Sequence, residues 1–317
     1  SWAMSISSQR KRRKEREEDN MSFIDEIFEN TIVEDAAPRE FDVEEWKQNK
    51  RVERDQAFNL ISQAAVALGH DDAHLKSYLD VQSRFDGYSV GNALLISAQA
   101  PDSTKLADFD TWKEAKVHIL KGESGIILIE PGKEYTKEDG TTGISYNTKR
   151  VFDISQTDAK IEDKPSVHYD MRFLVKALIS DAPCEFEAAG EDKLSNGRIA
   201  KYDSEANTIF VLQSADSGLY FENIARELAI ANFGKEGKTP ADPVFSGACV
   251  SYMLCRKFGL DVERFFFVEM PEFMTAKDDK AIRAELNIIR DTAVSMMGSI
   301  YRSFEKQKEA KARDDAR

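Results

Sequence analysis

The chain has 317 residues, of which 41% are hydrophobic and 32% charged, and its formal net charge is -13. This composition is typical of a globular protein with a hydrophobic core, and it excludes collagen-like, low-complexity and wholly disordered chains. The sequence contains no apolar run of about 18 residues that could form a transmembrane helix, and its polar, basic start lacks an apolar signal segment. We therefore expect a cytoplasmic protein that makes no membrane contact.

Cysteine and histidine are both scarce. The three cysteines are Cys184, Cys249 and Cys255, an odd number that predicts no disulfide framework and is typical of a reducing compartment. Only four histidines occur, which is few for a metal enzyme. No cofactor is predicted.

Residues 1–40 are predicted to be a flexible charged segment. It contains the basic run Arg10–Lys14, for which two interpretations stay open. One is a solvated, frayed segment, and the other is a basic arm that contacts nucleic acid.

The next part of the chain is predicted to be helical and then β. Apolar residues at helical spacing predict helices over 43–68, 72–83, 88–98 and 109–116. Compact apolar runs predict strands over 125–129 and 150–154. Pro131 and Gly132 are expected to end the first strand, and residues 133–143 to form a charged hairpin or loop.

After a polar linker over 155–166, the pattern is again mixed. Helices are predicted over 169–179, 221–233, 245–258 and 281–305, and a β-hairpin over 199–211 that turns at 203–207. The prediction is thus an α+β fold with two domains, 41–157 and 165–306, followed by a charged tail, 307–317.

Four segments of the first domain occur in a familiar order. They are 88–96 (YSVGNALLI), 109–113 (FDTWK), 121–126 (KGESGI) and 151–157 (VFDISQT). In this order and spacing they resemble the N-terminal domain of the ArdC-type antirestriction proteins and the related LtrC-like proteins of conjugative elements. The resemblance implies a domain of the kind that binds single-stranded DNA, encoded by plasmids and other mobile elements.

The resemblance also implies a second, zincin-like (minimal metallopeptidase) α+β domain. In that family a helix carries His-Glu-x-x-His, whose two histidines share one helix face, and a later helix supplies an acidic ligand. Here Arg226 and Ile230 stand at the two histidine positions, and Ala248 stands at the acidic one. Neither a guanidinium nor an aliphatic side chain can hold zinc. Cys249 and Cys255, six residues apart on one predicted helix, do not share a face and do not replace the ligands.

Only the general-base position of that motif is kept, as Glu227. A carboxylate without a metal to acidify water has little hydrolytic power, so the domain is interpreted as a degenerate metallopeptidase and the protein as non-enzymatic. Glu227 is either an exposed or salt-bridged helix residue, or a retained buried carboxylate paired with Arg226 or another cation. Glu222, four residues before Arg226, could also pair with that arginine.

Candidate DNA contacts in the first domain are aromatic and basic side chains, since proteins that bind single strands combine stacking rings with positive charge. These candidates are Tyr88, Trp112, Lys113, Lys116, Lys121, Lys149 and Arg150. The alternatives are core packing for Trp112, a packed helix start for Tyr88 and solvated surface charge for the lysines. Residues 51–157 hold 12 basic and 16 acidic residues, a balance that is unusual for a nucleic-acid domain.

These patterns favour a non-enzymatic protein of a mobile element that takes part in conjugative transfer or antirestriction. Its expected partners are single-stranded DNA or a conjugation or restriction protein. An acidic protein-interaction module or DNA mimic is the alternative, because such a chain can compete with DNA for a basic cleft. A working metallopeptidase with substituted ligands and a purely structural component are the remaining hypotheses.

Overall fold

A computed structural model describes residues 42–137, 139–160, 169–194, 197–213, 217–267 and 269–315. The chain divides into two compact units, Ser1–Gln48 and Asn49–Arg317. Apart from the start of the first helix, every element below belongs to the second unit. The predicted segment 1–40 with its basic run and the later part of the predicted linker lie outside the described residues.

Three helices begin the described chain. They are α2 (Val43–Ala67), α3 (Asp72–Arg84) and α4 (Val90–Gln99). The Asp71 carboxylate accepts the backbone N–H of His74 at the start of α3, and the Ser89 hydroxyl accepts that of Asn92 at the start of α4. Both caps satisfy donors that a helix start leaves unpaired. All three helices lie where the apolar spacing predicted them.

A three-stranded antiparallel sheet follows, with α5 (Phe109–Glu114) after its first strand and a short 3-10 turn (Ile154–Gln156) after its last. The strand order is β1-β3-β2, so β3 lies in the centre. The strands are β1 (Leu106–Asp108), β2 (Ile126–Thr136) and β3 (Thr142–Asp153). Helix α5 ends at Glu114, two residues before the predicted end at Lys116.

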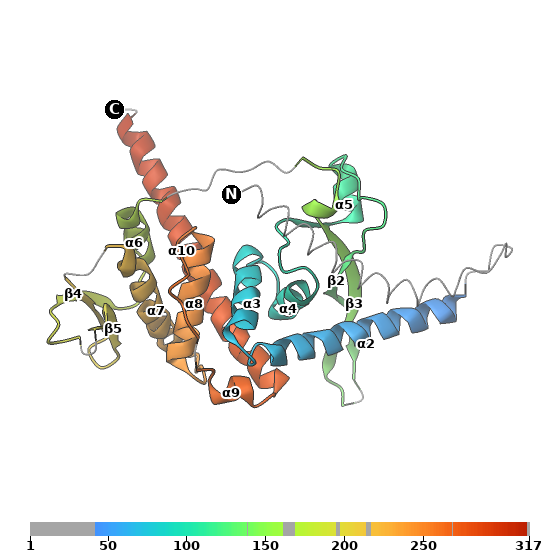
Figure 1. Cartoon of the computed structure of the whole chain (residues 1–317), viewed down its shortest axis with the longest axis horizontal. Coiled ribbons are helices and arrows are strands. Elements are labelled where there is room, and N and C mark those ends of the chain that lie inside the picture. Colours follow the sequence, from blue (N-terminus) through green and yellow to red (C-terminus); the bar gives the residue numbers. More distant parts are fainter. Residues whose placement is uncertain are drawn as a thin grey trace, which may run out of the picture. The chain divides into compact units, whose positions relative to one another are not determined.

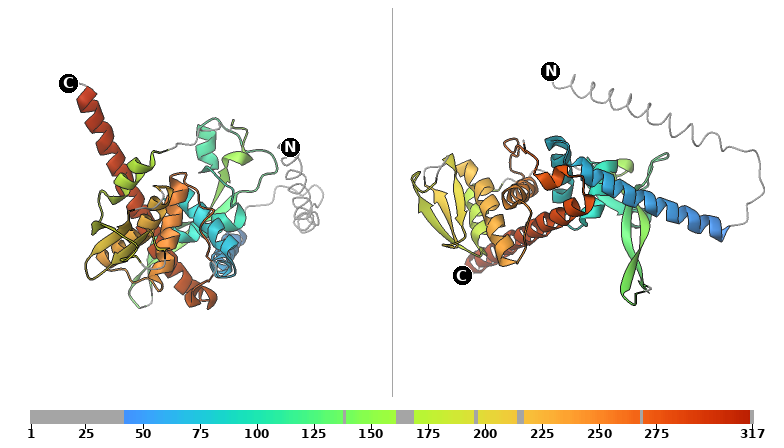
Figure 2. Two further views of the ribbon diagram at one scale, coloured as in Figure 1. Left: turned by 60° about the vertical axis from the view of Figure 1, so that its left-hand side comes forward. Right: turned by 90° about the horizontal axis from the view of Figure 1, so that it is seen from below.

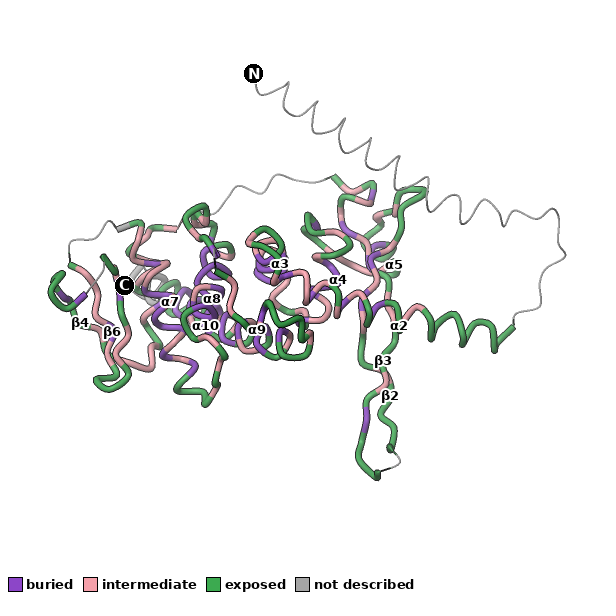
Figure 3. Tube along the Cα trace, turned by 60° about the horizontal axis from the view of Figure 1, so that its bottom comes forward, coloured by how far each residue is buried: buried purple, intermediate pink, exposed green. Residues whose placement is uncertain are grey.

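The hairpin of β2 and β3 is longer than predicted. β2 continues through Pro131 to Thr136, although we expected it to end at Pro131–Gly132. Proline has no N–H to donate, but β2 is an edge strand, where a missing donor is tolerated. The register shifts between Pro131 and Glu134, which absorbs the irregularity. Residues 133–143 were predicted to form either a charged hairpin or a loop, and they form a hairpin. Its tip is largely exposed (Figure 3).

Two amide side chains of α4 cover the free edge of β2. Asn92 donates to the carbonyl oxygen of Ile129 (2.9 Å) and accepts the N–H of the same residue (2.8 Å). Gln99 makes the same pair of bonds with Ile127, at 2.9 and 3.0 Å. Each amide thus presents to β2 the donor and acceptor that a neighbouring strand would present. This role explains the asparagine inside the segment 88–96.

The later part of the unit contains a second small sheet and most of the helices. Its elements are α6 (Met171–Ile179), β4 (Glu185–Ala189), β5 (Ala200–Asp203), β6 (Thr208–Leu212), α7 (Ser217–Lys235), α8 (Pro243–Lys257), α9 (Glu272–Thr275) and α10 (Asp279–Asp315). The predicted β5–β6 hairpin is confirmed, with Asn207 in the left-handed conformation (φ 47) at its turn. β4 pairs parallel to β6, giving the order β4-β6-β5.

α10 extends through Asp315, so most of the expected tail continues as helix beyond the predicted end at Glu305. An ion pair between Lys308 and Glu305 (2.9 Å) lies on this extension. Pairs at this helical spacing favour continuation of a charged helix.

One hydrophobic core joins elements from both halves of the unit. α3 packs against α8, and α4 packs against α10 (Figures 1 and 2). Leu79 of α3, Met253 of α8 and Ile300 of α10 are all fully buried members of this core. The fold is α+β, as predicted, while the division into domains at 157–165 stays a prediction. None of the described helices is long and apolar enough to cross a membrane.

Candidate functional site

Arg226 and Ile230, which the resemblance aligns with the two histidines, lie on α7, and Ala248, aligned with the acidic ligand, lies on α8, which packs against α7. Gly247 of α8 permits this close packing, because a Cβ atom there would lie 2.9 Å from the carbonyl oxygen of Arg226 and 3.1 Å from Cγ1 of Ile230. The same Cβ would lie 3.5 Å from Cγ of Arg226, so Arg226 and Ile230 both face α8, as the i, i+4 spacing requires. Ala248 is the next residue of α8 and is half-buried.

The side chains at these positions do not fit a metal. The guanidinium of Arg226 donates to Glu227 Oε1 (3.2 Å) and to Asn223 Oδ1 (3.3 Å). Ile230 packs against the hydrophobic core and brings no donor atom. Nowhere in the described ranges do three or more histidine, cysteine, aspartate or glutamate side chains group so that they could hold a metal ion. No reaction step through zinc can be derived for this helix pair.

Glu227 is a buried carboxylate, with 6% of the residue exposed. Its Oε2 accepts the backbone N–H of Tyr202 (2.9 Å) on strand β5, and its Oε1 faces Arg226. β5 is an edge strand of the second sheet, so Glu227 satisfies an edge donor that no neighbouring strand reaches. Of the two interpretations offered by the sequence, the buried carboxylate paired with Arg226 is correct.

Glu222 does not take the partner expected for it. The structure pairs it with Arg264 at 3.8 Å instead of Arg226. Burial raises the pKa of Glu222, and the nearby positive charge of Arg264 only partly opposes that effect. The i, i+4 spacing was therefore not sufficient to identify the ion pair, because Arg226 is already engaged by Asn223 and Glu227.

Trp112 is part of the core and is not available to stack on a base. Only 3% of the residue is exposed, and its indole N–H donates to the carbonyl oxygen of Phe152 (3.0 Å). The ammonium group of Lys105 lies over the ring, 5.3 Å from its centroid. Tyr88 is half-buried and contacts Phe85 edge-on, with ring centroids 5.9 Å apart.

The two basic candidates on β3 are held by acidic partners. Lys149 pairs with Asp108 (2.7 Å), and this bond holds the pKa of Asp108 well below its usual range. Arg150 pairs with Glu53 of α2. Burial alone would raise the pKa of Glu53, but hydrogen bonds from Thr148, Lys50 and Arg150 outweigh it and lower that pKa to about 2. Because side chains alternate along a strand, Lys149 and Arg150 lie on opposite faces of the sheet.

Lys113, Lys116 and Lys121 are exposed, as is Arg150. None of the three lysines has an ion pair within the described part of the chain. Lys113 lies in the last turn of α5, and Lys116 follows it in the left-handed conformation (φ 58). The structure thus gathers Trp112, Lys113, Lys116 and Lys149 around α5 and β3, and it places Arg150 against α2.

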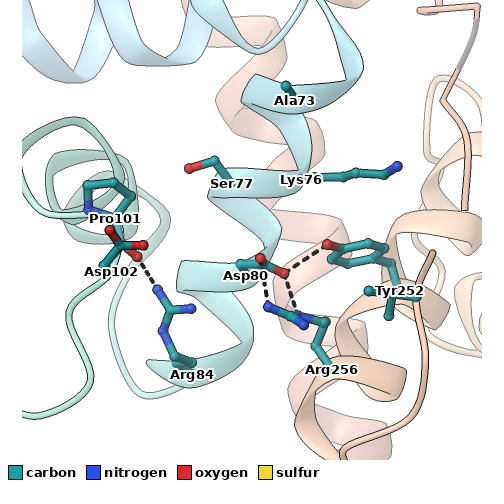
Figure 4. Close-up of a pocket in the computed structure, with 10 residues that line it drawn as sticks. Ala73, Lys76, Ser77, Asp80, Arg84, Pro101, Asp102, Tyr252 and Arg256 are labelled. Atoms are coloured by element: carbon teal, nitrogen blue, oxygen red, sulfur yellow. Dashed lines mark hydrogen bonds and ion pairs between the residues drawn. The ribbon is translucent and has the colours of Figure 1, made fainter. Parts of the chain in front are cut away.

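A pocket of about 440 Å³ between α3, α8 and the Pro101–Asp102 loop was not predicted (Figure 4). Its centre is Asp80, which accepts hydrogen bonds from the Tyr252 hydroxyl (2.8 Å) and from Arg256 Nη2 (2.8 Å). Arg84 donates to the carbonyl oxygen of Pro101 on the opposite wall. The two bonds of Asp80 join residues more than 170 positions apart in sequence, so no local spacing indicated them. They tie α3 to α8.

Comparison with known proteins gives a fold likeness and a distant relative. No protein-family model matches the chain. Two solved structures, the metal-free and Mn(II)-bound forms of the antirestriction protein ArdC from plasmid R388, are both similar to it. The metal-free form is 16% identical with a TM-score of 0.49, and the match covers 68% of this chain and 86% of that one. The Mn(II)-bound form has the same identity and TM-score, over 67% and 85%. ArdC is of the type that the four sequence segments resemble.

A curated relative is the uncharacterized protein pXO2-81 of Bacillus anthracis. It is 24% identical over 272 residues, which cover 69% of this chain and 46% of that protein. The present chain therefore spans about half the length of the relative that it matches.

Proposed function

We propose that this chain is a non-enzymatic protein of a mobile genetic element that acts in antirestriction or conjugative transfer. It would do so by binding single-stranded DNA or a DNA-processing protein. The order of the four segments within residues 88–157 supports the assignment to a mobile genetic element. The observation that carries the non-enzymatic part is that Arg226 and Ile230 stand where the two histidines would be. Both residues still lie on the face of α7 that packs against α8.

The bonds of Glu227 support the same proposal. A general base must be free to take a proton from water. Here one carboxylate oxygen accepts the Tyr202 N–H and the other faces the Arg226 guanidinium. Glu227 is therefore proposed to be a structural group that anchors β5 to α7, and the domain a pseudo-metallopeptidase.

Metal content and DNA binding test the two parts separately. After dialysis against zinc or manganese, elemental analysis is expected to find no stoichiometric metal in the folded protein. A fluorescein-labelled single-stranded oligonucleotide is expected to bind with an affinity that falls steeply as salt rises, because phosphate contacts release counterions. One bound zinc per chain, with peptidase activity that Glu227→Gln abolishes, would overturn the non-enzymatic part.

An acidic protein-interaction module is the second candidate. The net charge of -13 and the neutralisation of Lys149 and Arg150 by acidic partners favour it. This candidate predicts no binding to the oligonucleotide at low salt, together with salt-sensitive inhibition of a restriction endonuclease in a DNA-cleavage assay. Oligonucleotide binding without such inhibition would reject it.

A further inference from the structure

Phe109 is an exposed aromatic ring on the same helix as Lys113, a lysine with no ion pair among the described residues. It is the first residue of α5, and 57% of it is exposed, whereas Trp112 on the same helix is 3% exposed. An exposed ring of this size forgoes the stabilisation that full burial of a large apolar side chain gives. The surface of α5 therefore keeps an aromatic face in water, where a ligand can reach it.

Charges of both signs stand near this ring, and the one on its own face of α5 is positive. Lys113 stands four residues after Phe109, so the two side chains share a face of α5. Lys116 follows the end of the helix, with its N–H bonded to the carbonyl oxygen of Lys113 (3.0 Å). Asp110 and Glu114 also stand four residues apart, but their row is turned by about 100° from the row of Phe109 and Lys113.

Two acidic residues, Asp108 and Asp110, stand beside Phe109 in the chain, and one of them, Asp108, is already neutralised. Asp108 accepts the N–H of Thr111 (2.8 Å) as the N-cap of α5, and it pairs with Lys149 (2.7 Å). Its negative charge is therefore offset by an ammonium group, and it offers little repulsion to a phosphate that approaches Lys113.

We propose that Phe109 is the ring on which a base of single-stranded DNA stacks, and that Lys113 and Lys116 contact the phosphates beside that base. The proposal rests on the DNA-binding part of the proposed function and names the surface that would perform it. Every base has a flat π-face, so an exposed phenylalanine binds bases without a sequence code. Lysine ammonium groups supply the salt-dependent part of the affinity.

The test is the affinity of the full chain for a labelled oligothymidine of about 16 nucleotides, since single-strand sites span about 4–16 nucleotides. Phe109→Ala is expected to weaken binding by about 5- to 160-fold, the range found when one stacking ring is removed. Phe109→Tyr keeps the ring and is expected to restore most of the affinity. Lys113→Gln is expected to reduce the slope of log affinity against log salt by about 0.7, the value for one phosphate contact of a single strand.

Phe266→Ala and Lys201→Gln are the matched controls. Phe266 is an exposed phenylalanine (71%) in the loop after α8, and Lys201 is an exposed lysine on β5. Both variants are expected to bind like the unaltered chain. Thermal unfolding of each variant checks that the protein is still folded.

The possible outcomes distinguish a wrong assignment of this surface from a failure of the proposed DNA binding. If the unaltered chain binds the oligonucleotide but Phe109→Ala and Lys113→Gln bind equally well, the assignment of this surface is wrong and the proposed function stands. If the unaltered chain does not bind at low salt, the DNA-binding part of the proposed function fails and the surface assignment fails with it.

Discussion

The helix pair α7–α8 and the small sheet around β3 hold their charged side chains in different ways. On α7, Arg226 and Glu227 bond to each other and to neighbouring groups, and Glu227 is almost fully buried. Around β3, Lys149 and Arg150 have acidic partners, but Lys113 and Lys116 stay in solvent without one in the described chain. The first region uses its charges to hold the fold, whereas the second leaves two of its lysines exposed to solvent.

The difference shows that the partner of a charged group decides what that group can do. Both carboxylate oxygens of Glu227 already accept hydrogen bonds from the protein itself. A lysine at an unremarkable position keeps its ability to bind phosphate as long as nothing neutralises it. The experiments below change one partner at a time in these two regions.

Restoring the ligand set should have the largest effect. The triple variant Arg226→His, Ile230→His and Ala248→Glu is expected to bind about one zinc per chain, because both α7 positions already face α8, the helix that carries residue 248. Elemental analysis after dialysis measures the metal. Arg226→His with Ile230→Leu is the control, since one histidine is not enough to hold zinc. A metal-free triple variant that still folds would show that these positions do not converge.

Removing the buried carboxylate should have the next largest effect. Glu227→Ala leaves the Tyr202 N–H without an acceptor and Arg226 without its counter-charge. We expect it to lower the free energy of unfolding by about 2–4 kcal/mol in urea denaturation. Glu227→Gln keeps one acceptor for Tyr202 and should cost about 1 kcal/mol. Equal stability of all three proteins would contradict the structural role.

Gly247→Ala should force α7 and α8 apart. The new methyl group would lie within 3.1 Å of both the Arg226 carbonyl oxygen and Ile230, and overpacking of this kind typically costs about 1–3 kcal/mol. Gly298→Ala on α10 is the matched control, because its methyl would meet only the flexible end of Arg302, at 3.3 Å. Since alanine favours a helix over glycine, the control is expected to be neutral or slightly stabilising in the same denaturation assay.

Lowering the pH should weaken the ion pair between Glu53 of α2 and Arg150 of β3. We expect its effect on the free energy of unfolding to be smaller than that of the variants above. The pKa of Glu53 is lowered from 4.5 to about 2 in the folded protein. A lowered pKa stabilises the fold above the unfolded value of 4.5, and the gain is lost as pH falls from there toward 2.

Glu53→Gln removes this titration. At neutral pH the variant is expected to be less stable by about 1–2 kcal/mol, a figure that allows for solvent screening at the half-exposed Arg150. Between about pH 5 and pH 2 its stability should therefore decline less than that of the unaltered chain. Parallel curves of unfolding free energy against pH for the two proteins would show that Glu53 is not the titrating group.

The helices were predictable from the sequence because their signals are local. The apolar spacing of 43–68 and 72–83 and the glycine or capping residue beside each helix fix α2 and α3 within one or two residues. The strand β4 was missed because Glu185–Ala189 is polar and largely exposed, and its only strand partner is β6, about 20 residues later. The continuation of β2 past Pro131 depends on its place at the sheet edge, which the sequence alone does not reveal.

The candidate sites were predictable only in part. Helical spacing predicted that Arg226 and Ile230 share one face of their helix, but not that this face packs against α8. The bond from Tyr202 to Glu227 joins a strand to a helix and has no local signal. For the DNA candidates, residue type alone could not tell the buried ring of Trp112 from the exposed ring of Phe109. The pairing of Arg150 with Glu53 spans 97 residues, so it too could come only from the fold.

The amide groups of Asn92 and Gln99 also affect how copies of this chain can associate. An unprotected strand edge invites a strand from another molecule, which leads to aggregation or to exchange of elements between chains. At Ile127 and Ile129 the side-chain amides already occupy the outward-facing N–H and carbonyl groups. A second chain cannot extend the sheet there without first displacing four hydrogen bonds, so α4 keeps this strand edge closed to self-assembly.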